Sequence, residues 1–101
     1  MVFLKVNATD SISKLTYYFV AKDMESAEVR PEKKLLDQED RQKIFINNFI
    51  FDTVKIESVK EVDQQEVKDM TEKYKFALLD LAVGLIEKGC ADLMIVGSVI
   101  I

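Results

Sequence analysis

The sequence has no histidine, no tryptophan, one cysteine and one proline among its 101 residues. Without histidine the chain cannot form the Ser-His or Cys-His pairs that activate nucleophiles, and it lacks a common metal ligand. One cysteine cannot form an internal disulfide and does not make a cysteine-rich zinc site. The sequence therefore predicts no catalytic residues, no metal site and no cofactor, and we expect a protein that is not an enzyme.

Positive charge and long hydrophobic runs are also scarce. The 14 basic residues are outnumbered by 18 acidic residues, which gives a net charge of −4 and argues against binding to nucleic acid. The uncharged run at 93–101 is much shorter than the ~20 residues of a transmembrane helix, and the first residues lack the basic start of a signal peptide. We expect a soluble, cytoplasmic protein, and the lone Cys90 fits a reducing compartment.

The remaining composition is typical of a folded domain. Hydrophobic residues make up 49% and charged residues 32% of the chain, a balance that supports a packed core. The length is that of one domain, so we expect a single domain over 1–101. The acidic excess is greatest in the middle third, where it would form a solubilising face or a face complementary to a basic partner.

The first quarter of the chain predicts a β-hairpin. Residues 2–6 alternate between apolar and other side chains, which is the period of a strand. After a turn-rich stretch, the aromatic and β-branched segment 15–21 predicts a second strand. Alternation would place Tyr17 and Phe19 in the core and Tyr18, half-buried, on the other face.

The second quarter predicts an irregular segment, a helix and a strand. Proline disfavours helix just before it, so we expect 22–36 to be irregular. Asp37 is suited to cap a helix over 38–48, and the alternating segment 53–60 predicts a third strand. Acidic residues near both ends of the irregular segment could bind a cation. They are explained without a cation as residues of a solvated loop and of the first turn of a helix.

The third quarter carries clear helix signals. Asp63 is suited to cap a helix, and Glu66 stands where a capping box needs an acidic residue. Gly89 is placed to end the helix in the left-handed conformation. These signals predict one continuous helix over 64–88.

The final segment, 90–101, is apolar at nearly every position, which is typical of a buried central or parallel strand. With the strand and helix before it, it would form a right-handed βαβ unit. Gly97 inside it predicts a bulge or a close approach by another group. The predicted fold is a single α+β domain of order β-β-α-β-α-β, with a mixed four-stranded sheet and helices on one face.

The predicted helix over 64–88 has two apolar stripes. The first, expected to face the core, consists of Val67, Met70, Tyr74, Leu78, Leu81 and Leu85. The second consists of Phe76, Leu79, Val83 and Ile86. Exposing the second stripe would forfeit roughly 6–12 kcal/mol, against a typical total stability of about 5–15 kcal/mol. The second stripe must therefore be covered, either by the helix over 38–48 or by another chain.

An apolar strand that ends at the rim of a domain is often covered by an oligomer mate. This argument adds Ile100 to the second stripe and favours a homo-oligomer, most simply a dimer. The predicted interface consists of Phe76, Leu79, Val83, Ile86 and Ile100.

Small size, acidity, missing catalytic groups and surplus apolar surface favour one class of function. We expect an interaction module that binds another protein and regulates or inhibits it, the profile of small inhibitors and immunity proteins. One alternative is a structural subunit of a homo-oligomeric assembly, such as a viral or phage particle. Another is a small-ligand binder with its site at a subunit interface. The expected partners are a protein, a second copy of the chain or both, without nucleic acid or membrane.

Overall fold

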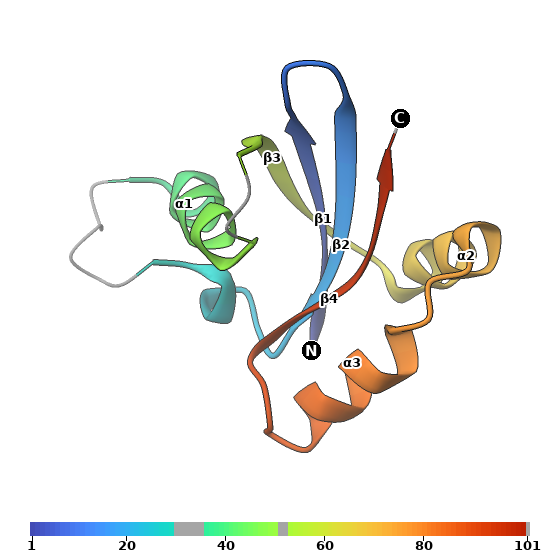
Figure 1. Ribbon diagram of the computed structural model, residues 1–101. Coiled ribbons are helices and arrows are strands. Elements are labelled where there is room, and N and C mark those ends of the chain that lie inside the picture. The colour runs from blue at the N-terminus through green and yellow to red at the C-terminus, as the bar shows by residue number, and fades with distance from the viewer. Residues whose placement is uncertain (30–35, 51–52, 101) are drawn as a thin grey trace.

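The computed structural model describes residues 1–29, 36–50 and 53–100. Its strands are β1 (Val2–Thr9), β2 (Lys14–Ala21), β3 (Lys55–Val62) and β4 (Leu93–Ile100). Its helices are α1 (Gln38–Ile50), α2 (Gln64–Tyr74) and α3 (Leu79–Glu87), with a short 3-10 helix, η1 (Glu25–Ala27). The predicted α+β class and the four strands are confirmed within this part of the chain (Figure 1).

The strands form one sheet in the order β3-β1-β2-β4, and each neighbouring pair is antiparallel. The predicted mixed sheet and the parallel βαβ unit are therefore wrong. The β1–β2 hairpin occupies the centre, with β3 beside β1 and β4 beside β2, so β3 and β4 form the two opposite edges. β4 is apolar at nearly every position because it contributes side chains to packing on both faces of the sheet.

Helices cover both faces of the sheet, so the prediction of helices on one face is wrong. Figure 1 shows α1 on one side of the sheet and α2 and α3 on the other. We call the two packed regions the first core, on the α1 side, and the second core, on the side of α2 and α3. The first core includes Leu4, Val6, Tyr17, Phe19, Ile46 and Val59. The second core includes Phe3, Tyr18, Val20, Val67, Ala82 and Ile86. Two cores arise because β2 is apolar on both faces and β1 adds Phe3 to the second face, and each apolar face must be covered.

The predicted hairpin is confirmed. Its turn is held by Asp10, whose carboxylate accepts hydrogen bonds from the backbone N–H groups of Ile12 (2.8 Å) and Ser13 (2.6 Å). Tyr17 and Phe19 lie in the first core as expected. Tyr18 faces the other way but is only 2% exposed rather than half-buried, because the second core surrounds it.

The helix predicted over 38–48 is α1, which begins where expected and continues to Ile50. Asp37 caps it as predicted, since its carboxylate accepts a hydrogen bond from the backbone N–H of Asp40 at 2.8 Å. Residues 30–35 of the predicted irregular segment lie outside the described residues, as does Ile101 at the end of the predicted final strand.

Both predicted ends of the long helix are confirmed, but its continuity is not. The carboxylate of Asp63 accepts a hydrogen bond from the backbone N–H of Glu66 at 2.9 Å, and Gly89 has φ 74°. Two backbone bonds close a Schellman motif there, from Gly89 to Ile86 (3.1 Å) and from Cys90 to Leu85 (2.9 Å). Between these ends the helix breaks into α2 and α3.

The break lies at Lys75, which adopts the left-handed conformation with φ 59°. Its cause is the pair of apolar stripes, because a straight helix turns only one of them toward a sheet. After the break, α2 packs Val67 into the second core, whereas α3 packs Leu79 and Ile86 there. Each half thus buries its own stripe against the same face of the sheet.

Phe76, within the break, packs directly on Gly97 of β4. A Cβ atom on Gly97 would lie only 2.4 Å from the Phe76 ring. The β2–β4 register also shifts between Tyr18 and Phe19, which leaves Val96 as an extra residue in β4. The bulge and the close approach predicted at Gly97 are therefore both confirmed.

Candidate interaction surface

Four of the five predicted interface residues pack inside the chain. Phe76, Leu79 and Val83 are partly buried against the second core, and Ile86 belongs to it. The face of the sheet covers them, rather than α1, which lies on the opposite face. The fifth residue, Ile100, is 71% exposed on β4.

The outward apolar surface comes instead from the C-terminal half of the stripe that was expected to face the core, whereas Val67 and Met70, in its N-terminal half, do pack into the second core. Leu78, the N-cap residue of α3, and Leu81 and Leu85 within the helix are spaced i, i+3 and i+7, which places them on one side. We call these three residues the outer face of α3. Leu81 is 57% exposed, Leu78 is 41% exposed and Leu85 is partly buried. Sequence reasoning missed this surface because the left-handed residue at the break is lysine, and a glycine is the usual signal for such a residue.

The outer edge of β4 is a second candidate surface. Among the described residues, β4 has β2 as its single strand neighbour. Its eight residues, LMIVGSVI, include no charged residue. The opposite edge strand, β3, has four exposed charged residues: Lys55, Glu57, Lys60 and Glu61. Charged side chains are a usual protection of edge strands against pairing, and β4 lacks them.

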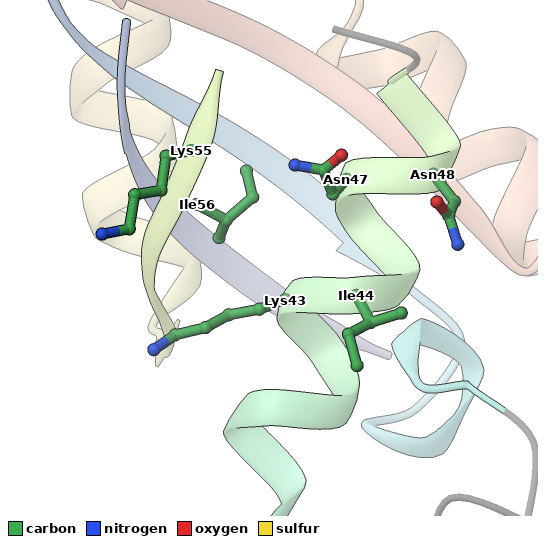
Figure 2. Close-up of a pocket in the computed structure, with 6 residues that line it drawn as sticks. All are labelled: Lys43, Ile44, Asn47, Asn48, Lys55 and Ile56. Carbon is green, nitrogen blue, oxygen red and sulfur yellow. The ribbon is translucent and has the colours of Figure 1, made fainter. Parts of the chain in front are cut away.

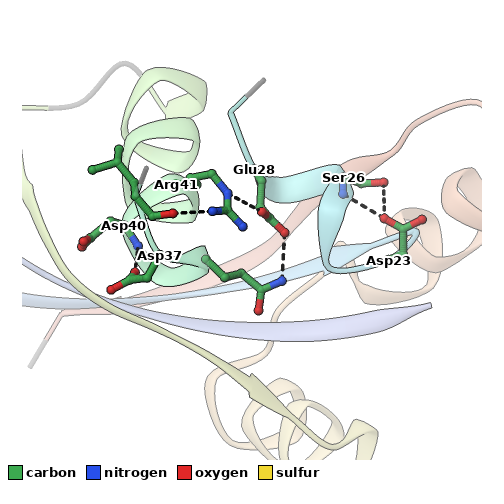
Figure 3. A network of polar contacts seen from close by, with 8 residues as sticks. Asp23, Ser26, Glu28, Asp37, Asp40 and Arg41 are labelled. Atoms are coloured by element: carbon green, nitrogen blue, oxygen red, sulfur yellow. Dashed lines mark hydrogen bonds and ion pairs between the residues drawn. The ribbon is translucent and has the colours of Figure 1, made fainter. Parts of the chain in front are cut away.

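The acidic residues near α1 are engaged with protein groups, as Figure 3 shows. Glu28 accepts hydrogen bonds from Arg41 (2.8 Å) and Gln38 (2.9 Å). The hydroxyl and backbone N–H of Ser26 donate to the carboxylate of Asp23, which lowers the pKa of Asp23. Within the described ranges no three acidic or cysteine side chains gather as metal ligands would.

A cavity of about 330 Å³ opens between α1 and β3 (Figure 2). Lys43, on its wall, is within 4 Å of two carboxylates of its own helix, Glu39 (3.8 Å) and Asp40 (3.9 Å). The side-chain amide of Asn47 donates to the backbone carbonyl of Val54 at 3.0 Å. Lys55 and Asn48 do not converge on a common point in Figure 2. The polar groups around this cavity either bond to other protein groups or point in different directions, so they do not form a preorganised ligand site.

A second cavity, of about 410 Å³, lies against β1, β2 and β3 near the hairpin turn. Three polar side chains on neighbouring strands, which we call the polar row, form a chain of hydrogen bonds on its wall. The hydroxyl of Thr16 donates to the side-chain oxygen of Asn7 (3.1 Å), and the side-chain nitrogen of Asn7 donates to the hydroxyl of Ser58 (3.1 Å). These three side chains satisfy one another. The row therefore stabilises strand pairing rather than presenting free groups to a ligand.

Tyr18 is the described residue with the largest change in pKa. Burial, and then the nearby Glu66 carboxylate, raise the pKa of Tyr18 to about 12. Its hydroxyl donates to Glu66 at 3.4 Å. The phenol is thus held in its neutral form and links β2 to α2, which is a structural role.

Two further predictions concern the surroundings of the protein. Cys90, placed by the sequence at the start of the buried final strand, is instead exposed at the turn between α3 and β4, which begins only at Leu93. In the described parts of the chain, no helix combines the length and the apolar character needed to cross a membrane.

Among the described residues, these observations make the outer face of α3 and the β4 edge the two candidate interaction surfaces. No protein-family model matches the chain, and no curated protein or solved structure is significantly similar to it.

Proposed function

We propose that the protein is an interaction module that binds another protein and regulates or inhibits it, through the outer face of α3. The observation that carries the proposal is the exposure of two leucines on one side of this helix, Leu81 at 57% and Leu78 at 41%. Burying a whole leucine side chain contributes about 1.5–3 kcal/mol. A partner that covered the exposed parts of both would gain on the order of 2 kcal/mol from them.

The spacing of these leucines suggests how a partner would bind. Anchors at i, i+3 and i+7 are those of a helix that lies in a hydrophobic groove. Asp80 and Glu87 are exposed on the same helix, and the whole chain has a net charge of −4. The proposed partner is therefore a protein with an apolar groove and a basic rim, because opposite charges speed association and select the partner.

Self-association and cytoplasmic location remain parts of the proposal. A homodimer is supported by the uncharged edge of β4 and by the 71% exposure of Ile100. The same features would suit the second candidate function, a subunit of a homo-oligomeric assembly. A site for a small ligand has less support, because the polar groups around the two cavities are engaged or diverge.

Substitutions that introduce charge test the outer face of α3. The test variant is Leu78→Glu with Leu81→Glu. Its matched control is Ile12→Glu with Ile44→Glu, because these isoleucines are also exposed, at 90% and 37%, and lie away from α3. Both variants gain the same charge at two exposed apolar positions, and thermal unfolding checks that both are folded.

The assay is affinity capture from cells of the source organism, followed by cross-linking and mass spectrometry. We expect one protein to be captured by the original chain and by the control variant, to cross-link near α3, and to be lost with the test variant. Capture that is equal for both variants would refute binding through the outer face of α3.

A further inference from the structure

The bulge in β4 changes which residues share a face of the sheet. In a regular strand consecutive side chains alternate between faces. At the bulge, Val96 and Gly97 both face the second core, since Val96 is buried in it and the Phe76 ring covers the Cβ position of Gly97. On either side of this pair the alternation resumes. Ile95 faces the first core, and Ser98 faces the same side because it pairs with Tyr17.

Because Val96 and Gly97 face the same side, the order in which side chains face the two cores is the same in both halves of β4, counted from this pair toward each end. From the centre outward, the residues in each half face the second core, the first core, the second core and again the first core. Leu93 and Ile100, at the two ends, thus face the same side, as do Met94 and Val99. An antiparallel copy of β4, centred on the bulge, would set every residue opposite one that faces the same side. Without the bulge this fully overlapped register would set residues of opposite faces together.

We propose that β4 pairs antiparallel with β4 of a second copy, about a two-fold axis between Val96 and Gly97. The two sheets then join into one sheet of eight strands. Ile100 packs against the partner's Leu93, and Val99 packs against the partner's Met94. This inference rests on the homodimer part of the proposed function and supplies its geometry, and it is independent of binding through α3.

Charge explains why the occupant is a second copy and why β4 is the edge that pairs. A two-fold axis pairs a strand with its own copy, so the charges of that one strand decide which charges stand opposite each other in the new ladder. β4 has no charged residue, and it forms a neutral pair with itself. β3 has two lysines and two glutamates, and its own register irregularity leaves Glu57 as an extra residue. The same kind of pairing, centred between Glu57 and Ser58, would set Lys55 opposite the partner's Lys60. Like charges opposite one another destabilise strand pairs.

A lysine at the exposed end of β4 tests the pairing. Ile100→Lys places two lysines per dimer against the partner's Leu93. Its matched control is Ile12→Lys, because Ile12 is 90% exposed in the hairpin turn and the change in charge is identical. Ser98→Lys is a second test variant, since Ser98 is exposed and faces the same side. Sedimentation velocity over a concentration series gives the dissociation constant of the dimer.

We expect the original chain and Ile12→Lys to form a dimer, and both β4 variants to raise its dissociation constant at least tenfold. A monomer at about 100 μM, far above the concentration that a standard interface requires, would overturn the inference. An unchanged dissociation constant in both β4 variants would also overturn it. Neither result bears on capture of a different protein through α3.

The single native cysteine supplies a second measurement, on the unsubstituted sequence. Cys90 is exposed and accepts a spin label. At about 3.4 Å per residue, the proposed register puts the two labelled cysteines of a dimer roughly 35–45 Å apart. Two α3 helices packed around Leu81 would put them within roughly 30 Å. The longer distance, measured by pulsed electron resonance, supports pairing through β4, and the shorter one overturns it while leaving a homodimer in place.

Discussion

The contact between Phe76 and Gly97 gives a sharp test of how the broken helix packs. A methyl group on Gly97 would lie 2.4 Å from two ring carbons of Phe76. Carbon atoms pack best at about 3.5–4.0 Å, so Gly97→Ala creates an overlap of about 1 Å. The Phe76 ring has to move, and it also lies 6.2 Å from the Tyr18 ring, between centroids. Overpacking of this kind costs about 1–3 kcal/mol, and we expect a loss of that size in the free energy of unfolding.

Gly84→Ala is the matched control for this substitution. Gly84 lies within α3, and a Cβ atom there would have no neighbour within 4 Å. Alanine is favoured over glycine in a helix, so we expect this variant to gain about 0.5–1 kcal/mol. The same chemical change is thus expected to have opposite signs at the two glycines. Urea unfolding followed by circular dichroism measures both free energies.

A double-mutant cycle identifies the partner in the overlap. In a Phe76→Leu background the smaller side chain leaves room, so Gly97→Ala should cost at least about 1 kcal/mol less than it does alone. Additive effects within about 0.5 kcal/mol would show that the ring does not sit on Gly97. That result would refute the intramolecular packing of Phe76 and return this residue to the predicted interface.

Three other residues give predictions that single variants test. The side-chain nitrogen of Gln42 is buried without a hydrogen-bond partner among the described residues, so Gln42→Leu should raise the free energy of unfolding by about 1–2 kcal/mol in urea titrations. Lys75 is left-handed, so Lys75→Gly should stabilise the chain by about 0.5–1 kcal/mol in the same assay. Tyr18 has its pKa raised from 10.0 to about 12 by folding, so its contribution is complete below pH 10 and is lost as the pH rises to about 12. Unfolding at pH 9, 10 and 11 should therefore show a decline that the Tyr18→Phe variant lacks.

Each of these predictions has a result that contradicts it. A loss of stability in Gln42→Leu would mean that the amide makes a bond in solution that the described contacts do not include. A less stable Lys75→Gly variant would argue that the break between α2 and α3 is not left-handed. Parallel pH profiles for the original chain and Tyr18→Phe would show that the phenol is solvated rather than buried.

Local signals were sufficient to predict most element boundaries. The caps at Asp37 and Asp63 and the left-handed Gly89 depend on residues within one helical turn, so the sequence alone reveals them. Gly97 was also informative, because a glycine in a strand has few structural uses. Its partner, Phe76, was not predictable, because their contact depends on how the helices cross the sheet.

Long-range geometry accounts for what could not be predicted. An apolar strand such as β4 has the same pattern whether it is central, parallel or placed at the edge of a sheet with a core on each face. Lys75 has no local signal for the left-handed conformation. A projection of 64–88 as one straight helix therefore predicted the inner stripe correctly in α2 but exchanged the inner and outer stripes in α3. The exposure of Leu78 and Leu81, on which the proposed function depends, follows from that break.

The order of strands also has a consequence for how the chain folds. The central hairpin joins segments that are close in sequence. β2, however, pairs with β4, so that Leu15 lies opposite Ile100, near the other end of the sequence. Pairings between distant segments form slowly because a long loop must close first. While the protein is being synthesised, β2 therefore keeps an open edge, and the aromatic face that includes Tyr18 stays uncovered until α3 and β4 emerge. A nascent chain that stalls before β4 would present a strand template for aggregation, and it is the form that would need a chaperone.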